Sequence, residues 1–245
     1  MLATLPMYDW PEVRDATDLF WSALAKELGE SGTLNRLINY ADAWLQPDLV
    51  FSQTCSYPFT HQLRGRVTYV ATPHYNVDGC DGPNYSSILF GREAKPLAAY
   101  RGCHTAISTT DSMSGMLALH LATAKLAANG PFFATQSISG GHVNSLIMVQ
   151  DGKADLCAID CVCVALARTY RPQLLEGLVE VGRSPSVPGL PIITQAGNVA
   201  ALRSALQVVF ADEPLKQACK TMLLSGYSVL EPKAYDVILD LENSL

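Results

Sequence analysis

The sequence predicts an α/β fold with two lobes, in which mixed, mostly parallel sheets are flanked by helices. The first observation is that 49% of the 245 residues are hydrophobic, which is enough to bury a sizeable core. The second is that short apolar runs alternate with amphipathic helical patterns, as in strand–helix units. The third is that residues 91–97 and 182–191 interrupt this alternation, the latter being dense in Pro and Gly.

The predicted elements follow one another in chain order. An apolar strand at residues 2–5 precedes an amphipathic helix at residues 17–28, which Gly29 closes. Apolar strands follow at residues 48–52 and 67–71. Three strand–helix pairs come next: residues 104–108 with 114–128, 132–135 with 142–150, and 155–159 with 161–170. This alternation indicates largely parallel sheets.

The two interruptions are interpreted as crossings between lobes. A chain that crosses twice builds one lobe from both of its ends, here residues 1–94 and 188–245, and the other from the continuous segment 95–187. We expect a ligand site in the cleft between the lobes, and hinge closure at the two crossings.

Charge and hydropathy argue against nucleic acid and membranes as partners. The 17 Lys and Arg residues against 23 Asp and Glu leave a net charge of −6, and the cations nowhere form a run. A duplex-binding protein gathers its cations on one face to neutralise phosphates. Asp155 and Asp160 interrupt one of the longest apolar stretches. No apolar stretch of the sequence reaches the roughly 20 residues that a membrane-spanning helix needs.

The amino terminus and the cysteines bear on the compartment. Residues 1–10 fit a strand and a turn rather than a basic segment followed by an apolar leader, so no export signal is predicted in this sequence. Seven cysteines are an odd number, which is not typical of a disulfide framework. Both observations favour a reducing compartment.

Small polar residues gather where predicted strands end and helices begin. Residues 108–116 read STTDSMSGM, more hydroxyls than an N-cap needs, which favours an anion site at this helix start. His142 lies at the next such junction, as an oxyanion donor or as a capping or surface histidine. Asp160 fits the N-cap of the following helix or a carboxylate presented to the cleft, and the two roles are compatible. Tyr8, Thr54 and Tyr75 follow strands of the other lobe and suit a small polar ligand, although packing alone explains each of them.

The sequence gives no positive sign of catalysis, cofactor or metal. The spacing of Cys157, Cys161 and Cys163 lacks the paired C-x2-C clusters of zinc sites, and buried small side chains explain these cysteines better. The histidines lack ligand spacing, and no nucleotide-binding or nucleophile-elbow motif is present. A hydrolytic pairing of Ser112 or Ser114 with His142 stays open, without support.

Several motifs, in order and with compatible spacing, make the chain resemble the substrate-binding proteins of phosphate, phosphite and phosphonate ABC transporters. The matching segments are residues 48–58 (DLVFSQTCSYP), 85–90 (YSSILF), 97–102 (LAAYRG), 111–115 (DSMSG), 139–142 (SGGH) and 152–160 (GKADLCAID). The resemblance covers most of the chain and implies a type 2 periplasmic-binding-protein fold. It implies a periplasmic, non-enzymatic protein that captures a small oxyanion for a permease, as a monomer or a weak dimer.

The resemblance also implies the roles of individual residues. Ser112, Met113, Ser114 and Gly115 match the helix start that cradles a phosphonate, through hydroxyls and N–H groups, and His142 matches a further donor. Asp160 would face the ligand, and Tyr8, Thr54 and Tyr75 would close over it from the other lobe. Met113 replaces a hydroxyl residue of the family motif and Gly141 a serine, which widens the ligand class to phosphate, another oxyanion or a carboxylate.

Two alternatives stay open. One is an enzyme on the same scaffold, since a fold does not fix a function. The thiamine-pyrimidine synthases are an example, although the cysteine spacing here does not match their contiguous cluster. The other is a cytosolic protein that senses an anion, because no leader is predicted.

Overall fold

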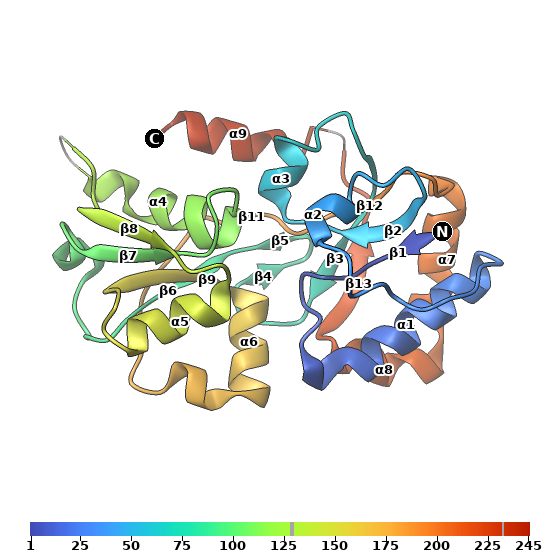
Figure 1. Cartoon of the computed structure of the whole chain (residues 1–245), viewed down its shortest axis with the longest axis horizontal. Coiled ribbons are helices and arrows are strands. Elements are labelled where there is room, and N and C mark those ends of the chain that lie inside the picture. The colour runs from blue at the N-terminus through green and yellow to red at the C-terminus, as the bar shows by residue number, and fades with distance from the viewer. Residues whose placement is uncertain (128–129, 232) are drawn as a thin grey trace. The chain divides into compact units, whose positions relative to one another are not determined.

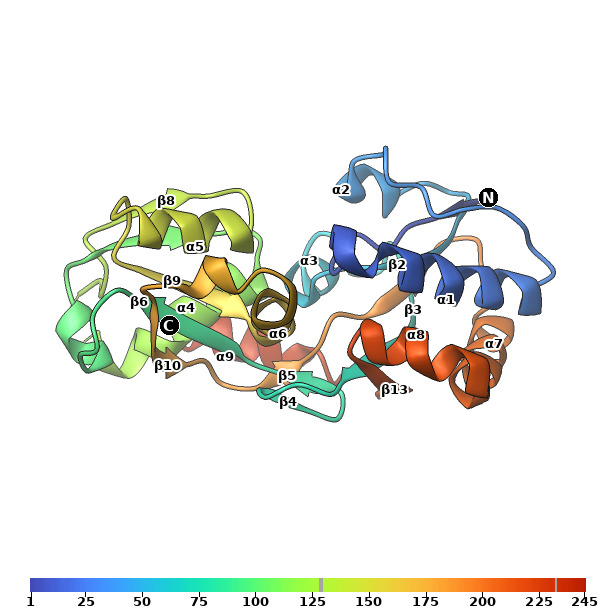
Figure 2. The ribbon, with the colours of Figure 1, turned by 90° about the horizontal axis from the view of Figure 1, so that it is seen from below.

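The computed structural model describes residues 1–127, 130–231 and 233–245. The chain divides by its internal contacts into two compact units. Unit 1 comprises Met1–Asn76 and Pro188–Ala234, and unit 2 comprises Val77–Val187 and Tyr235–Leu245. Figure 1 labels most of the helices and strands, and Figure 2 adds the label of β10.

The centre of unit 1 is a five-stranded sheet. Across the sheet the strands are β1 (Leu2–Ala3), β2 (Leu49–Gln53), β12 (Ile192–Thr194), β3 (Thr68–Tyr75) and β13 (Leu224–Ser228). β1 runs parallel to β2. β12 is antiparallel to both of its neighbours, and β13 is antiparallel to β3.

Helices cover both faces of this sheet. Their bounds are α1 (Arg14–Glu27), α2 (Tyr40–Ala43), α3 (Ser56–Thr60), α7 (Val199–Ala211) and α8 (Lys216–Thr221), with short 3-10 helices at Pro11–Val13 and Glu213–Leu215. Phe20, Trp21 and Leu24 recur at helical spacing on α1 and are buried in one core with α7, α8 and Ile192. Ile193 belongs to a second core with Trp44, since successive strand residues point to opposite faces.

Unit 2 is built on a second five-stranded sheet. Across it the strands are β10 (Val179–Arg183), β6 (Ser87–Gly91), β9 (Leu156–Asp160), β7 (His104–Ile107) and β8 (Thr135–Ile138). β7 is parallel to β8 and β9, whereas β6 is antiparallel to β9 and β10. A small second sheet has the order β11 (Val187–Pro188), β5 (Asn84–Tyr85) and β4 (Cys80–Asp81).

Three helical segments of unit 2 each follow one of its strands, and a last helix joins the unit from the carboxyl-terminal end of the chain. They are a π-helical segment at Met113–Leu117 that continues into α4 (Ala118–Thr123), α5 (His142–Gln150), α6 (Cys161–Tyr170) and α9 (Asp236–Asn243), with 3-10 helices at Leu97–Tyr100, Ala124–Leu126 and Pro172–Leu175. α5 and α6 have the bounds that the sequence predicts. Ala128, the last residue of the helix predicted at residues 114–128, lies outside the described residues. Within the described residues, no helix is both long enough and apolar enough to cross a bilayer.

The α/β fold class is confirmed, but the expected predominance of parallel strands is wrong for the described sheets. In the two five-stranded sheets as described, the ladders of β1 with β2, and of β7 with β8 and β9, are parallel, and the other five are antiparallel. The strand predicted at residues 132–135 is also displaced, because β8 spans Thr135–Ile138. Phe132 and Phe133 instead pack edge to face in the core of unit 2, so their apolar character reflects burial beside a strand.

The units differ from the predicted lobes in two segments. Residues 77–94 belong to unit 2 rather than to the discontinuous lobe, because β6 pairs with β9 and β10. The stretch 91–97 is therefore not a crossing, and the chain passes between units at Asn76/Val77 instead. Residues 235–245, which include α9, also belong to unit 2. The other boundary, Val187/Pro188, lies inside the predicted stretch 182–191.

Candidate functional site

Ser114 and His142 come together in unit 2, from two helix starts that follow parallel strands. Ser114 lies in the first turn after β7, and His142 is the first residue of α5, after β8. The Ser114 Oγ and His142 Nε2 atoms are 3.0 Å apart, within hydrogen-bond distance. Because β7 and β8 are neighbours and parallel, their carboxyl ends meet at one edge of the sheet.

His142 is held as a neutral imidazole. Burial lowers its pKa to about 4, against a smaller opposing contribution from the backbone carbonyl of Ala158. At neutral pH this side chain therefore offers one N–H donor and one acceptor and carries no positive charge.

Ser112 caps the helix start. Its Oγ accepts a hydrogen bond from the Gly115 N–H at 2.9 Å. This bond already uses the Gly115 N–H, one of the groups expected to hold the oxyanion. A Cβ on Gly115 would lie 2.0 Å from the Ser108 Oγ, so glycine permits the close approach of helix and strand here. Met113 is 1% exposed, and its side chain belongs to the buried interior.

Asp160 is the N-cap of α6. Its Oδ1 accepts hydrogen bonds from the Val162 N–H at 2.7 Å and the Cys163 N–H at 3.4 Å, and the residue is 2% exposed. The carboxylate also lies at the positive end of the helix dipole. The structure thus supports the capping role, one of the two roles that the sequence left open.

Removing this cap should destabilise the protein. We expect Asp160→Ala to lower the free energy of unfolding by about 1–2 kcal/mol, since two backbone donors lose their acceptor. Asp160→Asn should retain most of that stability, because its side-chain carbonyl still accepts. Urea unfolding of both variants measures the difference, and an Asn variant as unstable as the Ala variant would contradict the capping role.

Two of the predicted ligand residues of unit 1, Tyr8 and Tyr75, are in contact. The rings of Tyr8 and Tyr75 meet edge to face, with centroids 5.0 Å apart. Gln53 donates from Nε2 to the Tyr75 hydroxyl and to the Leu190 carbonyl, both at 3.1 Å. Thr54 is fully buried and donates its hydroxyl to the Cys55 carbonyl at 3.2 Å.

Two positioning groups were not assigned from the sequence. Gln53 orients Tyr75 through its hydrogen bond to the phenol. In the sequence this residue is visible as an amide at the end of an apolar strand. Near His142, the Ser139 and Ser145 hydroxyls are 2.7 Å apart, and the Ser139 hydroxyl also donates to the Gly141 carbonyl. These contacts tie the loop after β8 to the first turn of α5. Their only sequence signal is the serine spacing, which many loops share.

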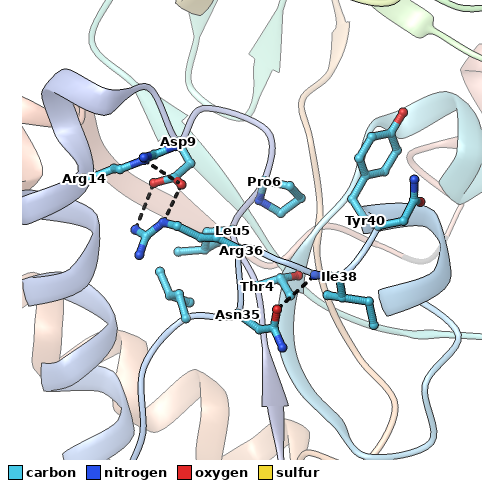
Figure 3. Close-up of a pocket in the computed structure, with 11 residues that line it drawn as sticks. Thr4, Leu5, Pro6, Asp9, Arg14, Asn35, Arg36, Ile38 and Tyr40 are labelled. Carbon is cyan, nitrogen blue, oxygen red and sulfur yellow. Dashed lines mark hydrogen bonds and ion pairs between the residues drawn. The ribbon is translucent and has the colours of Figure 1, made fainter.

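Unit 1 also holds a pocket of about 270 Å³ that no sequence pattern predicts (Figure 3). Among its lining residues, the Arg36 guanidinium donates to both oxygens of Asp9, at 2.6 and 3.0 Å. It also donates to Asp18 at 2.8 Å, and Arg14 lies 3.5 Å from Asp9. These carboxylates raise the pKa of Arg36 and neutralise its charge. The pocket therefore offers no uncompensated cation to an anion.

The three cysteines that the sequence raised as a metal or thiol site are buried in unit 2. Within the described residues, no three His, Cys, Asp or Glu side chains are grouped closely enough to hold a metal ion. Cys157, Cys161 and Cys163 are all buried, and burial contributes to raising the pKa of each thiol. They behave as buried thiols rather than as ready thiolate ligands.

Solved structures share this fold over nearly the whole chain. A methylphosphonate complex of PhnD1 from Prochlorococcus marinus matches with a TM-score of 0.77 and 17% identity, covering 100% of this chain and 98% of that one. XAC2383 from Xanthomonas citri bound to ATP matches with a TM-score of 0.71 and 17% identity, covering 99% and 96%. The binding protein component of an ABC phosphonate transporter from Pseudomonas aeruginosa matches with a TM-score of 0.70 and 12% identity. The match covers 99% of this chain and 85% of that one. These likenesses confirm the periplasmic-binding-protein fold.

A family model gives the stronger result. The model described as the periplasmic substrate-binding protein of a phosphonate ABC transporter matches residues 2–235. A search of curated protein sequences found no match. The resemblance inferred from the motifs is thus confirmed, and the chain belongs to the family of phosphonate ABC-transporter periplasmic substrate-binding proteins, which bind solutes.

Proposed function

We propose that this protein captures a small oxyanion with a tetrahedral phosphorus centre and presents it to an ABC-transporter permease. The observation that carries the proposal is the 3.0 Å pairing of Ser114 with a neutral His142 at the carboxyl edge of the unit 2 sheet. Neutral hydroxyl and imidazole donors can replace the hydration shell of an oxyanion, and hydrogen bonds to an anion are stronger than neutral ones.

The ligands of the structural relatives support the phosphorus class. The Prochlorococcus protein is in complex with methylphosphonate and the Xanthomonas protein with ATP. Both ligands carry anionic oxygens on tetrahedral phosphorus. The ligand-binding residues that we propose are Ser112, Ser114, His142 and Asp160 in unit 2, with the backbone of Met113 and Gly115, and Tyr8, Thr54 and Tyr75 in unit 1. To bind the ligand, the Gly115 N–H would exchange its bond to the Ser112 hydroxyl for one to the oxyanion.

We propose further that the protein performs no chemistry on its ligand. A Ser–His hydrolase needs a histidine whose pKa lies near the working pH, so that it can take the serine proton. Burial holds the pKa of His142 at about 4, which makes it a weak base. The pair therefore suits donation to an anion better than activation of a nucleophile.

The location and assembly that we propose follow from the family. A member that serves a permease works in the periplasm as a monomer or a weak dimer, and domain closure accompanies solute capture. A cytosolic anion sensor on the same fold is the second candidate, favoured by the odd number of cysteines, seven. Fractionation of cells that express the native gene distinguishes the two locations.

A thermal-shift panel tests the ligand class. Protein is unfolded, dialysed and refolded to remove any bound solute, then melted with phosphate, phosphite, methylphosphonate, aminoethylphosphonate, sulfate or acetate. We expect a saturable rise in Tm with at least one phosphorus oxyanion and none with acetate, since a ligand that binds only the native state stabilises it. A rise with acetate alone, or none with any anion, would overturn the proposal.

A further inference from the structure

Two thiols outside the proposed ligand site lie in direct contact. The Sγ atoms of Cys80, on β4, and Cys161, the first residue of α6, are 3.4 Å apart. Both belong to unit 2, where the β4–β5 hairpin lies beside the start of α6 (Figure 1 and Figure 2). Cys80 is half-buried and Cys161 is 1% exposed, so a small reagent reaches Cys80 first.

The backbone holds the two cysteines together. The Ser86 N–H and hydroxyl donate to the carbonyl of Gly79, the neighbour of Cys80, at 2.9 and 3.1 Å. The Cys161 N–H donates to the Ser86 carbonyl at 3.2 Å. One residue thus anchors both sides of the thiol contact.

Gly79 makes this close approach sterically feasible. Its φ is +101°, a conformation that other residues rarely adopt. A Cβ at this position would lie 2.8 Å from the Cβ of Cys161. The contact between β4 and α6 therefore depends on a residue without a side chain.

From this geometry we propose that Cys80 and Cys161 form a redox pair that low-molecular-weight disulfides convert into an intramolecular disulfide. The Cys80 thiolate attacks one sulfur of glutathione disulfide, whose S–S bond breaks as the mixed disulfide forms and one glutathione leaves. The Cys161 thiolate then attacks the Cys80 Sγ and releases the second glutathione. The two protein thiols lose two electrons and two protons, and the two glutathione sulfurs are reduced to thiols.

The environment of Cys161 favours this order of attack. Its hydrogen bond to Cys80 is the largest cause that raises the pKa of the Cys161 thiol, followed by burial and the charge of Asp160. When Cys80 enters the mixed disulfide, its thiol no longer takes part in that hydrogen bond. The Cys161 thiolate then forms more readily, next to the sulfur that it attacks.

Peptide mapping of the native, full-length protein tests the proposal. Fully reduced protein is incubated with glutathione disulfide, the remaining thiols are alkylated, and the protein is digested without reduction. We expect one cross-linked peptide pair that contains Cys80 and Cys161, with the other five cysteines alkylated. Two results for the wild type would overturn the proposal. In one, Cys80 and Cys161 are both recovered as alkylated thiols; in the other, Cys80 remains linked to glutathione.

Three variants sharpen the test. Cys161→Ser should stop at the Cys80–glutathione mixed disulfide, and Cys80→Ser should yield no disulfide at Cys161. Cys103→Ser, which alters another half-buried thiol of unit 2, should behave like the wild type. The oxidised wild type should melt several degrees above the reduced protein, because a cross-link over a long loop constrains the unfolded chain. A lower Tm after oxidation would mean that the link distorts the native contact, contrary to the proposal.

Discussion

Replacing Ser114 and His142 together by alanine is expected to abolish binding of methylphosphonate, or of whichever phosphorus oxyanion the panel identifies. Each hydrogen bond to a charged group contributes about 1.5–3 kcal/mol, so each single variant should weaken binding roughly 10- to 100-fold. The double variant loses both donors and should fall below detection in isothermal titration calorimetry. Its far-UV circular dichroism should match the wild type.

The chain contains a matched control for this experiment. Ser137 and His104 form another serine–histidine pair in unit 2, with the Ser137 Oγ 3.0 Å from the His104 Nε2. This pair joins β8 to the beginning of β7, away from the helix starts. Alanine at both control positions should leave the affinity unchanged. Equal losses in the two double variants, or unchanged affinity in a folded Ser114/His142 variant, would reject the site.

The second large effect is a loss of stability as the pH falls from 6.5 to 4. The pKa of His142 is about 4 in the folded protein and about 6.5 in the unfolded chain. Between these values the unfolded chain binds more protons than the native protein, so the free energy of unfolding increases with pH. At pH 4 the native protein should have lost roughly 3 kcal/mol relative to pH 7 from this group alone. Well above pH 6.5, where the unfolded chain has also lost this proton, the group should contribute almost no slope.

Comparison with His142→Gln isolates this contribution. Burial also lowers the pKa of His74 and His120, so the wild type has further pH dependence in the same direction. Urea unfolding of wild type and variant at pH 7, 6, 5 and 4.5 gives the difference between the two proteins at each pH. That difference should shift in favour of the variant as the pH falls. If the free energies of unfolding of the two proteins change with pH in parallel, His142 does not titrate as the buried group described here.

Local signals were sufficient for several elements. The Gly140–Gly141 pair before His142 and the Asp160 cap before Cys161 mark helix starts, and both helices begin where these residues predict. The Asp160 signal is local because its capping bonds join residues only two or three positions apart. The serines at positions 112 and 114 likewise predict a helix start. The sequence did not predict that the Ser112 hydroxyl accepts the Gly115 N–H.

Long-range pairing decided what the local signals misplaced. Residues 91–97 look like a crossing because their composition breaks the alternation, yet Gly91 pairs with Leu156 and Val179 at the end of a central strand. Phe132 and Phe133 look like strand residues, but they fill the core beside β8. An apolar run reports burial, and only the packed chain determines whether that burial occurs within a sheet or next to one.

By itself the sequence determined the α/β class, the family and the small polar residues at the strand ends. Periodicity, caps and motifs all depend on residues that are close together in the sequence. The tertiary structure decided the strand directions, the boundary at Asn76/Val77, and the pairing of Ser114 with His142 and of Cys80 with Cys161. These contacts join residues 28 and 81 positions apart. No local pattern specifies such a distance, since it depends on how the sheets assemble and on the close approach that Gly79 and Gly115 permit.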